Sequence, residues 1–75
     1  MNQAHLIKMA NQIGTFFEAM PDREQAVADV ATHFKRTWDP RMRMELLEVL
    51  CGANEATLKT LVRDALIALR QLDSA

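Results

Sequence analysis

The chain has 75 residues, of which 49% are hydrophobic, and its formal net charge is −1. A chain of this length forms one domain at most, which we expect to span residues 1–75. The small net charge provides no long-range field for nucleic acid or an anionic membrane. The lone Cys51 excludes an internal disulfide. No signal-peptide pattern and no apolar run near the ~20 residues of a membrane span is present, so we expect a cytoplasmic protein.

The first predicted helix extends from about Asn2 to Ala19. Gly14 inside it costs roughly 1 kcal/mol relative to alanine, so it marks either a close helix approach or a tolerated exception. Apolar residues spaced by three and four define one stripe, with Phe16 at its edge. That stripe contains Leu6, Met9, Ala10, Ile13, Phe17 and Met20.

The second predicted helix extends from Arg23 to about Thr37, and Asp22 is its expected cap. Gln25, three residues after Asp22, completes an approximate capping box. His33 is expected to flank the apolar stripe as a hydrogen-bonded packing residue. The stripe itself contains Ala26, Val27, Val30, Ala31, Phe34 and Trp38.

The third predicted helix starts after an Asp cap, at Pro40, and continues to about Cys51, where Gly52 stops it. Proline suits the first helical position because it lacks the donor that would be unpaired there. The main stripe contains Met42, Leu46, Val49, Leu50 and Ala53, while Met44, Leu47 and Cys51 project away from it. This helix is too apolar for one side of a small bundle.

The fourth predicted helix is capped by Asn54 and extends to about Leu72. Its expected inward residues are Leu58, Leu61, Val62, Ala65, Leu69 and Leu72, and its outward residues include a basic line beside Leu66 made of Lys59, Arg63 and Arg70. No strand pattern is present. The predicted fold is an all-α, small, compact four-helix domain with short connectors.

No catalytic residue, metal ligand or cofactor-binding residue is predicted. The sequence contains no nucleophile elbow, phosphate-binding glycine loop or HExxH motif. His5 and His33 lie far apart, and neither has a partner at metal-ligand spacing. Cys51 lies at a helix C-terminus, where the helix dipole disfavours a thiolate, so we expect it to act as a small apolar residue.

The connector between the second and third helices concentrates cations, namely Lys35, Arg36, Arg41 and Arg43. Three interpretations stay open: a solvated face with ion pairs to Glu45 and Glu48, of which Arg41–Glu45 has helical i,i+4 spacing, a nucleic-acid site, or a surface that docks on a partner protein. Trp38 is either a core residue or an interface anchor. Met42 and Met44 are either core filler or an adaptable docking surface.

Two blocks of the sequence resemble the delta subunit of soluble NAD-dependent formate dehydrogenases. The resemblance covers about His5 to Leu72, with mild departures at Lys35, where arginine is expected, and at Thr37, where a bulkier residue is common. The first block is Met9-Ala10-Asn11-Gln12-Ile13 with Phe16-Phe17, and the second is His33-Phe34-Lys35-Arg36-Thr37-Trp38-Asp39-Pro40-Arg41-Met42-Arg43. Leu61-Val62-Arg63-Asp64-Ala65-Leu66 is similar but generic.

The resemblance implies a non-catalytic, cofactor-free subunit that assembles or stabilises the complex by binding its large alpha subunit. In this family a molybdenum or tungsten bis-pterin, iron–sulfur clusters and a flavin are carried by the other subunits. The residues expected to bind the partner are Trp38, Arg41, Met42, Arg43, Met44 and Leu47. Two alternatives remain: a transient assembly factor for cofactor insertion, and a self-associating helical domain that is regulatory or binds anions.

Overall fold

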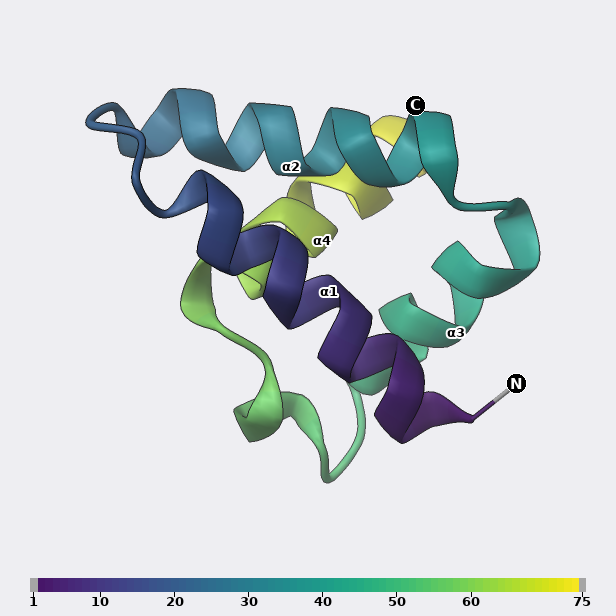
Figure 1. Ribbon diagram of the computed structural model, residues 1–75. Helices are drawn as coiled ribbons and strands as arrows, with labels where there is room; N and C mark the ends of the chain where they lie inside the picture. The colour runs from purple at the N-terminus through teal and green to yellow at the C-terminus, as the bar shows by residue number, and fades with distance from the viewer. Residues whose placement is uncertain (1, 75) are drawn as a thin grey trace.

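The computed structural model describes the backbone of residues 2–74 and the side chains of residues 2–71. Within this range the chain forms α1 (Gln3–Phe17), α2 (Arg23–Thr37), α3 (Pro40–Val49), a 3-10 turn η1 (Glu55–Thr57) and α4 (Thr60–Ser74). Figure 1 shows α4 lying behind α1 and beneath α2, with α3 at the side. The structure confirms the all-α four-helix fold. None of the described helices is both long and apolar enough to cross a membrane.

Two of the predicted helix caps are present. The Asp22 carboxylate accepts a hydrogen bond from the Gln25 amide at 3.2 Å, and Asp39 accepts from the Met42 amide at 2.9 Å. Pro40 occupies the first turn of α3, as its missing donor and fixed φ favour. These caps satisfy donors that the first turn of a helix leaves unpaired, so the α2–α3 connection can be as short as Trp38 and Asp39.

The segment between α3 and α4 differs from the prediction. Helix α3 ends at Val49 rather than Cys51, because the next three amides bond carbonyls only three residues back and tighten the last turn. Asn54 does not cap α4, which begins six residues later at Thr60. Its side chain instead donates to the Gln3 amide oxygen at 3.0 Å.

Asn11 of α1 holds the start of α4 in place. Its Nδ2 donates to the Thr57 carbonyl at 2.9 Å, and its Oδ1 accepts from the Lys59 amide at 3.0 Å. A side chain remote in sequence therefore satisfies backbone groups that a local cap was expected to satisfy.

The core is organised around α4, which packs most extensively on α2 and also contacts α1 and α3. Leu66, which was not among the predicted inward residues of its helix, is fully buried, and Ile7, which was not in the predicted stripe of the first helix, is only 7% exposed. A helix with neighbours on several sides buries more than one stripe, which explains both differences. The other fully buried α4 residues are Leu61, Val62, Ala65 and Leu69. The Leu72 side chain lies outside the described part of the chain.

Gly14 marks the close approach of α1 to α4. It is buried, and a Cβ atom built on it would lie 2.7 Å from Val62 Cγ2, closer than real Cβ contacts allow. The first of the two interpretations of Gly14 is therefore confirmed. The missing side chain lets the two backbones come together at this point.

Candidate docking surface on the third helix

Trp38, at the α2–α3 corner, belongs to the core. Its side chain is only 5% exposed, and its ring packs edge-on against Phe34 with centroids 4.9 Å apart. Phe34 is itself fully buried. Of the two roles considered for Trp38, the structure therefore places it inside the domain, where it joins α2 to the core.

Arg43 is held against the end of α2. Its Nη1 donates hydrogen bonds to the carbonyl of Lys35 at 2.9 Å and to that of Trp38 at 3.1 Å. The last carbonyls of a helix lack intrahelical partners and carry partial negative charge, so a guanidinium satisfies them well. Sequence reasoning offered Arg43 as a partner-binding residue. The structure gives it a cap-like role within the chain, and partner binding by Arg43 stays a prediction.

Arg41 is exposed and does not form the expected ion pair with Glu45. The ion pairs found among the described residues join Arg23 to Asp64, Lys59 to Glu18 and Arg63 to Glu55. Glu45 is half-buried, and its Oε2 is shielded from solvent without a hydrogen-bond partner among the described residues. The ion-paired interpretation of the cluster is therefore wrong for Arg41 and Glu45.

Lys35 and Arg36 have a simple explanation in the helix itself. Both are exposed in the last turn of α2, where cations interact favourably with the helix dipole. Together with Arg43, they place three cations at the C-terminal end of this helix. The basic cluster is thus partly a consequence of α2 ending where it does.

The outer face of α3 carries the apolar excess that the sequence predicted. We define this face by residues spaced three or four apart, namely Arg41, Met44, Leu47, Glu48 and Cys51. Met44 is 63% exposed, while Leu47 is half-buried and packs against the core. Met42 is also half-buried, on the inner side. The excess therefore centres on Met44, with Arg41 one turn before it and Cys51 exposed beyond the helix end.

Phe16 was placed only at the edge of a stripe by sequence reasoning. It is the most exposed large hydrophobic residue described, at 76%, and it packs edge-on against Phe17 with centroids 5.2 Å apart. Phe17 belongs to the stripe that faces the core, so the adjacent Phe16 points away from the core. That position could have identified Phe16 as exposed from the sequence. The second apolar surface of the molecule thus lies at the end of α1.

The described residues contain no group of three or more His, Cys, Asp or Glu side chains that could hold a metal ion. A small cavity of about 190 Å³ lies between α1 and the α3–α4 connector, lined by Ala4, Ile7, Asn54 and Thr57. None of these side chains is ionisable.

The family model for the NADH-dependent formate dehydrogenase delta subunit, FdsD, matches residues 5–66. Comparison with curated proteins and with solved structures gives no match. The matched range includes the α2–α3 corner, the outer face of α3 and most of the buried positions of α4. The chain therefore belongs to the family of NADH-dependent formate dehydrogenase delta subunits.

Proposed function

We propose that the chain is a non-catalytic accessory subunit that assembles or stabilises a formate dehydrogenase complex. It docks on the large catalytic subunit through the outer face of α3. The observation that carries this proposal is Met44, 63% exposed on a helix of a chain in a delta-subunit family. Together with the half-buried Leu47 on the same face, Met44 provides apolar surface that a partner can cover.

The chemistry of this face suits a protein partner. Methionine is flexible and polarisable, so Met44 adapts to an irregular apolar pocket, and its burial contributes about 1–2 kcal/mol. Arg41 offers a cation without an ion-pair partner among the described residues. Arginine is favoured at interfaces because its planar fork binds carboxylates and carbonyls in pairs.

The remaining predicted binding residues have supporting roles in this proposal. Trp38 and Arg43 tie α3 to the end of α2 through the core and through two carbonyl bonds. Met42 and Leu47 pack α3 against the core from either side. These contacts set the orientation in which Met44 and Arg41 are presented.

The redox chemistry of the complex belongs, in this proposal, to other subunits. The molybdenum or tungsten bis-pterin, the iron–sulfur clusters and the flavin are expected there, and this chain contributes stability to the assembly. Loss of the chain should then lower the yield or lifetime of the complex. It should leave the activity of each intact catalytic subunit unaltered.

A co-purification experiment tests the proposal. Tagged chain carrying Arg41→Ala and Met44→Gln should recover much less large subunit than the wild type. Lys8→Ala is the matched control, since Lys8 is an exposed cation on a different helix, α1. Unchanged recovery with the double variant would reject the docking face. Substoichiometric wild-type chain in fully active complex would instead indicate a transient assembly factor.

A further inference from the structure

We propose that a groove between α1 and α2 binds a helix of a partner protein whose exposed face carries an acidic residue, an apolar residue and a basic residue in succession. This second surface is separate from the outer face of α3 and does not depend on the role proposed for that face. The groove encloses about 250 Å³ and is lined by Phe17, Asp29, Thr32, His33, Arg36 and Thr37.

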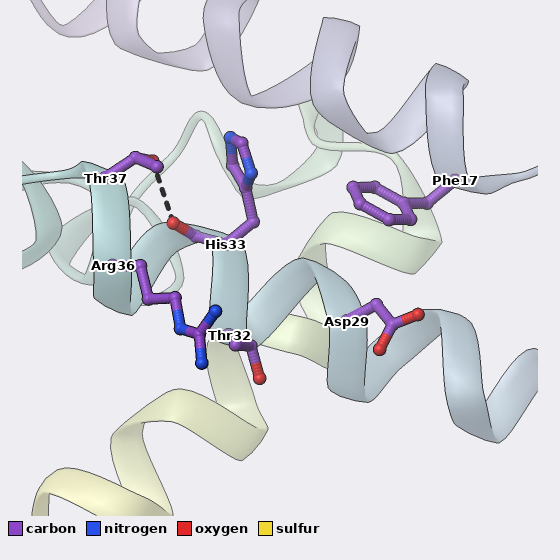
Figure 2. Close-up of a pocket in the computed structure, with 6 residues that line it drawn as sticks. All are labelled: Phe17, Asp29, Thr32, His33, Arg36 and Thr37. Carbon is purple, nitrogen blue, oxygen red and sulfur yellow. Dashed lines mark hydrogen bonds between the residues drawn. The ribbon is translucent and has the colours of Figure 1, made fainter.

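Two aromatic rings line the groove. Phe17 reaches it from the end of α1, on the side of Asp29, while His33 lies on α2 between Asp29 and Arg36, as Figure 2 shows. The Phe17 and His33 rings meet edge-on with centroids 6.3 Å apart. Phe16, 76% exposed and packed on Phe17, extends the apolar surface beyond the groove. Together these rings form a seat for an apolar side chain.

The two ends of the groove carry opposite charges. Arg36 is exposed, and its side chain makes no hydrogen bond or ion pair with any residue in the described part of the chain. Asp29 accepts one bond at Oδ1 from the Gln25 side chain at 2.8 Å, which leaves Oδ2 for a further donor. The two residues are seven positions apart, which is about 10 Å along a helix axis.

This charge pattern selects the occupant. A ligand of one charge sign, such as a nucleic-acid backbone, would be attracted at Arg36 and repelled at Asp29. A partner helix presents side chains seven residues apart on one face at the same spacing of about 10 Å, with an apolar residue between them. Such a helix can place a carboxylate on Arg36, a cation on Asp29 and its apolar residue against Phe17.

Several other cations of the molecule already have partners within the chain. Arg23, Lys59 and Arg63 each pair with a carboxylate, and Arg43 is engaged by backbone carbonyls. Arg36 lies on the groove that the Phe17 and His33 rings line, and its side chain has no such partner among the described residues. An exposed ion pair is weak alone, but a pair that closes over a buried apolar anchor is shielded from water and salt.

A displayed library of 15-residue helical peptides, randomised on one face, tests the proposal with the full chain as bait. We expect enriched peptides to carry an acidic and a basic residue seven positions apart with an apolar residue between. A synthetic enriched peptide should bind Arg36→Gln or Asp29→Asn about tenfold more weakly than wild type. Lys8→Gln, which also removes one exposed cation, should bind it as wild type does.

A charge exchange sharpens the test. The double variant Asp29→Arg/Arg36→Asp should prefer a peptide in which the acidic and basic residues are interchanged. Three results would overturn the proposal: no enrichment, enriched peptides of a single charge sign, or affinities unaffected by the groove variants. Binding of single-stranded oligothymidylate that Arg36→Gln abolishes would also overturn it, as would a homodimer that the same change dissociates. Circular dichroism of each variant confirms that the helices are retained.

Discussion

The α2–α3 corner and the outer face of α3 come from one short run of sequence but have different physical roles. At the corner, Trp38 is buried, Asp39 caps α3 and Arg43 binds the last carbonyls of α2. On the outer face, Arg41 and Met44 are exposed and contribute little to the fold. Folding therefore explains the residues of the corner but not the exposed residues of the outer face. We expect a partner to bind at the outer face.

The largest expected effect is at the corner, with Trp38→Ala. Removing a buried aromatic side chain typically costs about 3–5 kcal/mol, and a domain of this size has little stability to lose. We expect the variant to be largely unfolded at room temperature, as measured by urea titration followed by circular dichroism. A midpoint equal to that of the wild type would show that Trp38 does not hold α2 to the core.

Gly14→Ala should be next, at the α1–α4 contact. Alanine gains up to about 1 kcal/mol in helix propensity, but its Cβ would overlap Val62, and overpacking costs about 1–3 kcal/mol. We expect net destabilisation in thermal unfolding. In the double variant Gly14→Ala/Val62→Ala the two costs should not add, because the smaller side chain makes room. Additive losses would contradict the close approach.

Arg43→Ala should lower stability by about 1–2 kcal/mol, because two carbonyls at the end of α2 lose a charged donor. Arg41→Ala is the matched control on the same helix, and its free energy of unfolding should change by less than about 0.5 kcal/mol. Equal losses from the two changes, measured by urea unfolding, would contradict the distinction between corner and outer face.

The smallest effect on folding is expected from Met44→Gln. Its side chain is 63% exposed, so the free energy of unfolding should stay within about 0.5 kcal/mol of the wild type. Binding to the large subunit should weaken all the same. A variant with strongly reduced stability would show that Met44 belongs to the fold and that its exposure has no bearing on docking.

The local parts of the structure could be predicted from the sequence. Asp22 and Asp39 act on amides three residues away, so the cap pattern locates both helix starts. Helix α2 has the predicted bounds, Arg23–Thr37, because its caps and its apolar stripe agree. The family resemblance and the apolar excess of α3 were likewise visible in the residues themselves.

The tertiary parts could not be predicted in the same way. Asn54 has the chemistry of a cap, but Asn11 from α1 supplies the bonds at the start of α4. Leu66 was left out of the predicted inward residues because one stripe per helix presumes one neighbouring surface, whereas α4 contacts three helices. The hydrogen bonds of Arg43 could not be predicted either, because they depend on where the end of α2 lies relative to α3. The spacing of residues along α3 does not give that position.

The accessibility of Cys51 in the complex tests the central claim most directly. This thiol is the only one in the chain and is exposed just beyond the outer face of α3. Its alkylation by iodoacetamide can be followed by mass spectrometry of its peptide, in the isolated chain and in the purified complex. If α3 docks on the large subunit, alkylation should be much slower in the complex. Equal rates in a complex containing the chain at full stoichiometry would contradict docking through this face.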